Sequence, residues 1–142
     1  MHGQGYSQKK NWLLAQSLVE FALVLPMLLL LILGAMDFGR MFYTKMVLTN
    51  AAREGANYLA YHQSDKDDGY VNTFAAIEAE VNSSYVEVGA EDVEYLDCCT
   101  LAEKVGVKIT TTIDLIFDGI LQSFGLLGGP VELTSTVWMV VQ

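Results

Sequence analysis

The most apolar part of the chain lies near its N-terminus, between Leu18 and Met36. These 19 residues contain one charge, Glu20, and no charged residue occurs from Phe21 to Met36. About 20 apolar residues in a helix are enough to cross a bilayer. The pattern therefore predicts a membrane-spanning helix over residues 18–36, with a carboxylate close to its start and Pro26 inside it.

The helical pattern continues beyond the predicted span. Residues 37–62, DFGRMFYTKMVLTNAAREGANYLAYH, contain no proline. Asp37 and Arg40 are three residues apart, so they can pair on one helix face. A helix from Leu18 to His62 would have 45 residues and would be roughly 67 Å long at a rise of 1.5 Å per residue. It would extend far beyond one membrane.

Small and apolar residues in this extension indicate close helix packing. The spacing of four that lets helix backbones approach occurs at Ala35 and Gly39, Ala51 and Gly55, Ala52 and Ala56, and Ala56 and Ala60. An apolar stripe also runs along residues 38–60, and an isolated stalk would leave that stripe in water. We therefore expect neighbouring subunits to cover it.

The rest of the chain reads as a small head, residues 63–142. A loop, QSDKDDGY, precedes a segment with helical periodicity, and three later segments are typical of strands because they alternate and are rich in β-branched residues. The stretch 114–127 fits either a short helix or an apolar loop. The predicted fold class is α+β, a long helix carrying one head helix and about three antiparallel strands. The expected head helix covers residues 70–85, and the expected strands cover 92–100, 104–115 and 131–142.

Charge is distributed unevenly along the chain. The net charge is −9, with +2 on residues 1–64 and −11 on residues 65–142. Phosphate contacts need Lys and Arg, so the acidic head argues against nucleic acid as a partner. Lys9 and Lys10 before the span favour a cytoplasmic N-terminus, although Arg40, Lys45 and Arg53 after it weaken that inference.

A cleaved secretory signal peptide does not fit the N-terminus. Such peptides have an apolar core of about 7–15 residues followed by a small-x-small cleavage motif. This apolar run is longer, and the LGAMDFGR that follows offers no convincing small-x-small pair. The run is therefore expected to stay in the mature protein.

Three sequence blocks in this region resemble a known family. AQSLVEFALVLP begins at Ala15, DFGR begins at Asp37, and AAREGA begins at Ala51 and includes Arg53, Glu54 and Gly55. Together they resemble the TadE-like pilins of the tight-adherence (Tad, type IVc) branch of type IV pili. The resemblance covers residues 15 to about 60, close to a third of the chain, whereas the head is similar only in outline.

The resemblance implies a division of the chain and a function. Residues 1–15 would be a leader that a prepilin peptidase removes between Ala15 and Gln16, although Gly is commoner than Ala at this position in such families. Residues 16–62 would be the long helix. The chain would be a major or minor structural subunit, held in the inner membrane with its head outside and then assembled into an adhesive surface filament. Its partners would be other pilins and the pilus assembly platform, with no cofactor and no enzymatic activity.

The same resemblance gives Glu20 a role. A charge at the centre of a membrane helix costs roughly 2.5–3.5 kcal/mol on insertion scales, and such residues usually have a partner. After cleavage Glu20 would be the fifth residue, and the new amine of Gln16 in a neighbouring subunit could pair with it. The alternative is that Glu20 reaches water at the interface. Pro26 removes a helical hydrogen bond, which predicts a kink or a locally melted turn near Ala22.

Other candidate chemistry is weaker. Cys98 and Cys99 are adjacent, which suits two small buried residues, a vicinal disulfide or a bond between subunits, but not a zinc site. The loop SDKDDG fails the EF-hand spacing, which leaves only a loose calcium site on Asp65, Asp67 and Asp68 against a solvated acidic loop. No catalytic motif was recognised.

A rival class of function fits the same anchor. The chain could be a permanently membrane-anchored surface module that binds a ligand or partner protein through its head. The stripe on residues 38–60 favours the filament. The behaviour of a fragment starting near Asp37 would separate the two, since a monomeric, soluble stalk favours the rival.

Overall fold

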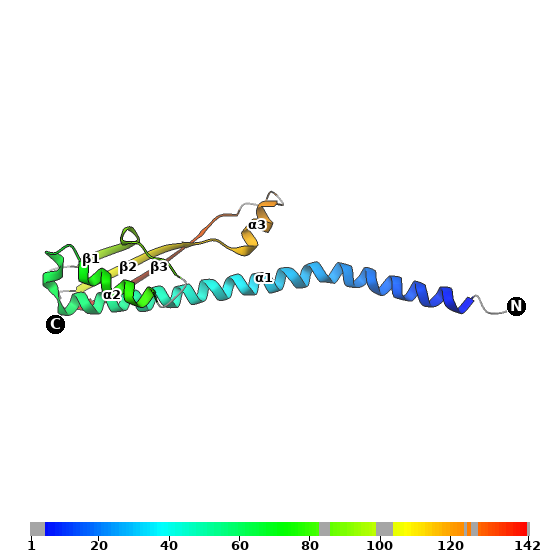
Figure 1. The fold of residues 1–142 in the computed structure, drawn as a ribbon, viewed down its shortest axis with the longest axis horizontal. Helices are drawn as coiled ribbons and strands as arrows, with labels where there is room; N and C mark the ends of the chain where they lie inside the picture. Colours follow the sequence, from blue (N-terminus) through cyan, green and yellow to red (C-terminus); the bar gives the residue numbers. More distant parts are fainter. Residues whose placement is uncertain (1–4, 83–85, 99–103, 124, 126–127, 142) are drawn as a thin grey trace.

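The computed structural model describes residues 5–82, 86–98, 104–123, 125 and 128–141. One helix, α1 (Gly5–Tyr61, 57 residues), runs the length of the molecule, and the head lies along its C-terminal half (Figure 1). The predicted α+β architecture is confirmed. The order of elements is α1, a short 3-10 turn η1 (Gln63–Lys66), α2 (Val71–Val81), η2 (Ala90–Asp92), β1 (Val93–Cys98), β2 (Lys104–Ile113), α3 (Ile116–Ser123) and β3 (Val131–Val140).

The long helix differs from the prediction at two points. It begins at Gly5 rather than near Gln16 or Ser17, because residues 7–15 hold no proline or glycine and include Gln, Lys, Leu and Ala, which favour helices. It also passes through Pro26 without interruption, so the melted turn predicted near Ala22 is not seen. The axis curves gently instead (Figure 1).

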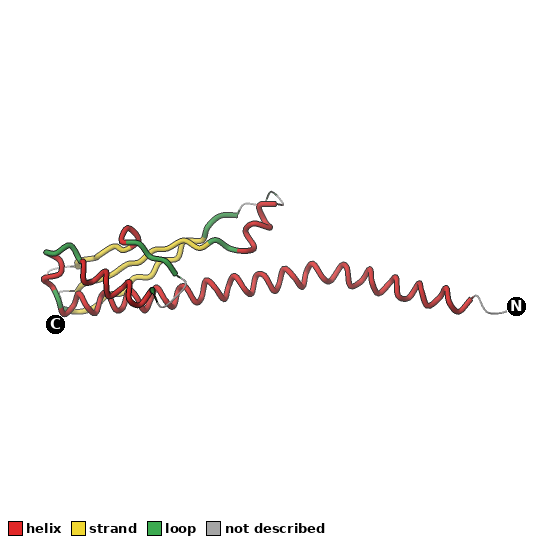
Figure 2. Tube along the Cα trace, viewed as in Figure 1, coloured by secondary structure: helices red, strands yellow, loops and turns green. Residues whose placement is uncertain are grey.

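The three strands form one antiparallel sheet in the order β1-β2-β3, and both α1 and α2 contact the core that it builds (Figure 2). Strand β2 is central, with Val107 opposite Tyr95 on one side and Val137 on the other. Its alternate residues Val105, Val107 and Ile109 are buried, as expected of a strand with one face on a core. Residues 116–123, which fitted a helix or a loop, form α3.

The core joins the last four turns of α1 to the head. Leu48, Ala51, Ala52, Ala56 and Leu59 are fully buried. At Gly55 an added Cβ would lie 2.6 Å from Cγ1 of Ile77 on α2, so this position needs glycine for the close approach of the two helices. The expectation that neighbouring subunits cover the apolar stripe on residues 38–60 is therefore wrong for its part within residues 48–60, because the chain's own head covers that face.

Candidate functional site

Within the part of the chain that the structure describes, nothing covers the apolar segment of α1 that begins at Ala15, here called the uncovered half of α1. From Ala15 to Ile32 every residue is exposed, and Leu31 remains 72% exposed. Residues 15–36 rise roughly 33 Å at 1.5 Å per residue, close to the 30 Å or so of a bilayer's hydrocarbon core. By length and composition, Ala15–Tyr61 is one helix able to cross a membrane. This uncovered apolar segment is the candidate site for membrane insertion and subunit packing.

Glu20 lies inside this uncovered segment, exposed on α1. No ion pair to Glu20 is found among the residues that the structure describes. A carboxylate inside a membrane span usually has a partner, and none is found for Glu20 in the described ranges. The pairing of Glu20 with the amine of a neighbouring chain stays a prediction. Ala15 and Gln16, the predicted cleavage site, are exposed in the same continuous helix.

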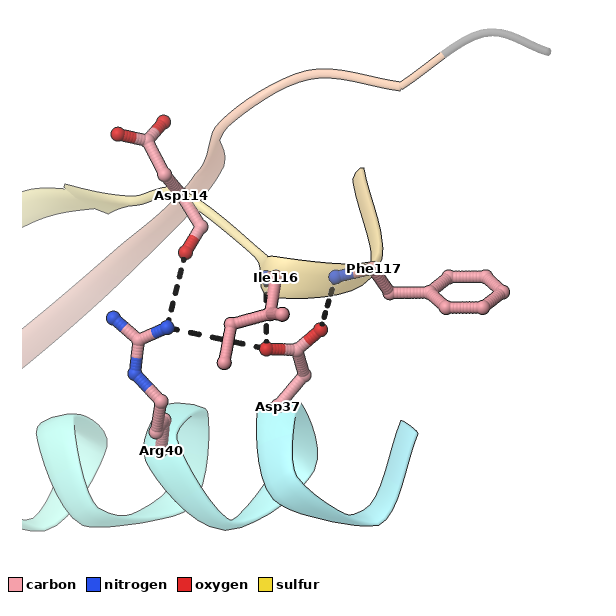
Figure 3. Close-up of polar contacts among 5 residues, drawn as sticks. All are labelled: Asp37, Arg40, Asp114, Ile116 and Phe117. Atoms are coloured by element: carbon pink, nitrogen blue, oxygen red, sulfur yellow. Dashed lines mark hydrogen bonds and ion pairs between the residues drawn. The ribbon is translucent and has the colours of Figure 1, made fainter. Parts of the chain in front are cut away.

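Asp37 has a role that the sequence did not indicate. It is only 5% exposed, and its carboxylate accepts hydrogen bonds from the backbone N–H groups of Ile116 and Phe117 at 3.0 and 2.8 Å (Figure 3). These are the first two residues of α3, whose N–H groups have no partner within the helix. Asp37 therefore caps α3 from a position 79 residues away.

Arg40 completes this contact. Its Nη1 lies 3.9 Å from Oδ1 of Asp37, so the predicted pair is present as a long ion pair. The same Nη1 donates a hydrogen bond to the carbonyl oxygen of Asp114 at 3.4 Å (Figure 3). Asp37 and Arg40, both in the DFGR block, thus hold the start of α3 against α1. We call this contact the Asp37 clamp.

Of the other residues predicted for helix packing, Gly55 packs against another element of the described chain, whereas Gly39 meets none. Gly55 lies in the core against Ile77, so its packing partner is within the chain. An added Cβ at Gly39 would meet nothing within 4 Å, so no partner in the described part of the chain uses that glycine. Arg53 and Glu54 are exposed.

The acidic loop is organised around one buried aspartate. Asp65 is 3% exposed. Its Oδ1 accepts from the backbone and side-chain amides of Asn72 at 3.2 and 2.8 Å, and its Oδ2 accepts from the backbone N–H and hydroxyl of Thr73 at 2.8 and 2.5 Å. Burial raises the pKa of Asp65, but these hydrogen bonds outweigh it and the net pKa is lowered.

This arrangement replaces the calcium alternative with a capping role. Asn72 and Thr73 lie in the first turn of α2, whose N-cap residue, Tyr70, makes no capping bond with its side chain. Both carboxylate oxygens of Asp65 are engaged there, while Asp67 and Asp68 are exposed. Within the described residues no group of three His, Cys, Asp or Glu could hold a metal ion.

A tyrosine pair supports the same loop. Tyr70 has a left-handed backbone with φ of 62°, which is uncommon for a residue with a bulky side chain. Its ring stacks on Tyr95 of β1 with centroids 4.0 Å apart and planes at 4°. Burial, with smaller contributions from Asp65 and Tyr70, raises the pKa of Tyr95 to about 12. Sequence reasoning did not find this pair.

The cysteines give no site. Cys98 is the last residue of β1, opposite Lys104. Cys99 lies outside the described residues, so the alternatives for this pair stay predictions.

Comparison with known proteins gives a family match over the uncovered half of α1 and the segment that follows it. Residues 15–57 match the family model of TadE-like protein. Neither the curated proteins nor the solved structures give a match to this chain. The match contains the predicted cleavage site, Glu20, the Asp37 clamp residues of α1 and the AAREGA block. The segment of this chain from residue 15 to residue 57 is therefore similar to TadE-like protein, as its motifs indicated.

Proposed function

We propose that the chain is a pilin-like structural subunit of a Tad-type pilus, held in the inner membrane by α1 and later packed by α1 into a surface filament. The observation that carries this proposal is the uncovered apolar half of α1, continuous with a helix that is itself built into the head. The TadE-like match over residues 15–57 supports the assignment to a pilus.

The apolar half must be covered in each state that the subunit occupies. An exposed apolar surface of this size is not left in water by a soluble protein. In the membrane, lipid covers it. In a filament, the same half of neighbouring subunits would replace lipid, with small residues such as Gly34 and Gly39 allowing close approach. The head lies along one side of the other half of α1 (Figure 1), so it would lie outside such a bundle.

Processing would prepare Glu20 for this exchange. Removal of residues 1–15 by a prepilin peptidase leaves an amine on Gln16, four residues before Glu20. A neighbour's amine that pairs with Glu20 would neutralise both charges away from water. The pair would also fix the axial position at which a new subunit enters the filament.

The test compares two glutamates on one helix. We expect Glu20→Ala to leave membrane insertion intact and to reduce the subunit in a sheared surface fraction by about tenfold or more, since an unpaired amine would stay in an apolar core. Glu54→Ala is the matched control, because Glu54 is exposed on α1 outside the span. It should assemble normally.

Two results would count against this role of Glu20. One is a normal amount of the Glu20→Ala subunit in the sheared fraction. The other is an equal loss for Glu54→Ala, which would show that any lost carboxylate on α1 has the same effect.

A permanently anchored surface module is the second candidate. It is favoured by the burial of Leu48, Ala52 and Ala56 under the chain's own head, which removes one reason for requiring neighbours. The solubility of a fragment starting near Asp37 no longer separates the two functions, because both now allow a monomeric stalk. Polymerisation does separate them, since a fixed anchor is never released by shearing.

A further inference from the structure

We propose that the start of α3, residues 116–117, is a foot that rests on the outer surface of the membrane while the subunit awaits assembly, with the ring of Phe117 in contact with lipid at the boundary between headgroups and acyl chains. This inference rests on the proposed function only in that it needs α1 to span a bilayer. It assigns a lipid partner to a part of the head that lies outside the TadE-like segment.

The Asp37 clamp fixes the height of the foot. Asp37 is the first charged residue after the apolar run that ends at Met36, so it marks the level at which α1 leaves the hydrocarbon. Its carboxylate holds the backbone N–H groups of Ile116 and Phe117 at 3.0 and 2.8 Å. The first turn of α3 therefore lies at the same level, and α3 belongs to the end of the head that reaches toward the N-terminal half of α1 (Figure 1).

The side chains at this point suit a lipid surface. Ile116 is 44% exposed, and Phe117 is half-buried. The ring of Phe117 points away from Arg40, toward the side of α1 from which the apolar half extends (Figure 3). The side chain of Ile116 points the other way, back toward Arg40 (Figure 3), so the ring of Phe117 is the apolar group that can enter the headgroup boundary by a few ångströms.

The charged residues around the start of α3 indicate an apolar contact with lipid and not an electrostatic one. Arg40 pairs with Asp37. Asp114 precedes α3 and Asp118 lies in its first turn, so carboxylates outnumber cations at this contact. Anionic lipids attract clusters of Lys and Arg, which are missing from the described part of α3. The contact would therefore be apolar, and it would not need anionic lipid. A second copy of the chain is the other occupant to consider, but a single subunit in a bilayer meets lipid at this level before it meets another head.

Photocrosslinking of the full chain in phosphatidylcholine vesicles tests the foot. The photoreactive residue p-benzoylphenylalanine replaces Phe117 in one variant and Tyr61 in the matched control. Tyr61 is also an exposed aromatic residue, but it lies 24 positions beyond Asp37 on α1, about 36 Å farther from the membrane. We expect lipid adducts at position 117 to exceed those at position 61 by about tenfold.

The outcomes separate the alternatives. Equal lipid adducts at positions 117 and 61 would overturn the proposal, and so would adducts of position 117 with a second copy of the chain and not with lipid. A strong requirement for added phosphatidylglycerol would overturn the apolar basis of the contact. Resistance of the chain to carbonate extraction is measured in the same vesicles. An integral chain without lipid adducts at 117 refutes the foot alone, whereas a chain released by carbonate refutes the membrane-anchored subunit itself.

Discussion

The two halves of α1 are one continuous helix, but they face different surroundings. In residues 15–36 nearly all the large apolar side chains are exposed in the described structure, as Leu31 is at 72%. In residues 48–60 the inward face is dominated by alanine, with Gly55, and its larger members, Leu48 and Leu59, are fully buried. The first half exposes large apolar side chains that lipid or other helices could cover. The second half has small side chains that let the head pack close to the helix backbone. Small residues four apart therefore do not by themselves indicate contact between subunits.

Two aspartates, one on α1 and one in the loop that follows it, cap the two helices of the head. Asp37 caps α3 and Asp65 caps α2, and neither belongs to the helix that it caps. The residue before α3, Leu115, has no polar side chain, and Tyr70 makes no cap for α2. Both head helices thus depend on a carboxylate supplied from outside, which ties the head to the C-terminal half of α1 and to its following loop.

The largest expected effect comes from removing a core side chain. We expect Ile77→Ala to lower the free energy of unfolding of the head by about 2–5 kcal/mol, because Ile77 of α2 is fully buried against α1 and the sheet. Urea denaturation of the detergent-solubilised chain, followed by near-ultraviolet circular dichroism, measures the change. Ile32→Ala makes the same change in the uncovered half, where Ile32 is 53% exposed. An equal loss for both variants would contradict the difference between the halves.

A smaller effect is expected at Asp65, and it depends on pH. We expect Asp65→Asn to lower the stability of the head by about 1–2 kcal/mol at neutral pH, because the ionised carboxylate caps α2. The pKa of Asp65 is lowered in the folded state, since hydrogen bonds from Thr73 and Asn72 outweigh the opposing effect of burial. Its contribution is therefore fully present above the unfolded pKa of about 3.9 and is lost as pH falls through the lower folded pKa.

Urea denaturation between pH 7 and pH 2 measures this dependence. The wild-type chain and Asp65→Asn should differ most at neutral pH and should converge in acid. Asp68→Asn is the control, because Asp68 is exposed on the same loop. If the difference between wild type and Asp65→Asn were constant down to pH 2, the capping role of the ionised carboxylate would be refuted.

The smallest of the three effects compares two glycines of α1. Gly55→Ala places a Cβ 2.6 Å from Ile77, whereas an added Cβ at Gly34 meets nothing within 4 Å. Alanine favours a helix over glycine by about 0.8–1.0 kcal/mol, while overpacking costs about 1–3 kcal/mol. We expect a net loss of about 1 kcal/mol for Gly55→Ala and no loss for Gly34→Ala, measured by the same denaturation. A stabilised Gly55→Ala would show that α2 can shift without cost.

Local patterns account for what the sequence predicted well. Apolar periodicity identified the long helix and α2, and alternation in β-branched segments identified the three strands. The helix begins at Gly5, earlier than the predicted range of 16–62, because the residues before Gln16 also favour a helix. Nothing local shows that Asp37 meets Ile116, which lies 79 residues later, or that the apolar stripe beyond Leu48 folds under the head. Such contacts depend on how the chain returns on itself, which periodicity does not contain.

The residues of the candidate site also divide into those that local sequence could identify and those whose role depends on distant contacts. Glu20 and Pro26 stood out because they interrupt an apolar run, so single residues were enough to find them. Asp65 drew attention for its acidic neighbours, but its burial and its partners in α2 set it apart from Asp67 and Asp68. A cap supplied across a loop has no fixed spacing from the helix that it serves, unlike a local capping motif.

The central claim is that α1 leaves the membrane and enters a filament. Mass spectrometry of the N-terminal peptide, from cell membranes and from a sheared surface fraction, tests it most directly. The account predicts that the chain in the sheared fraction begins at Gln16. A chain that still begins at Met1 and occurs only in membranes would contradict it, and the role proposed for Glu20 would fall with it.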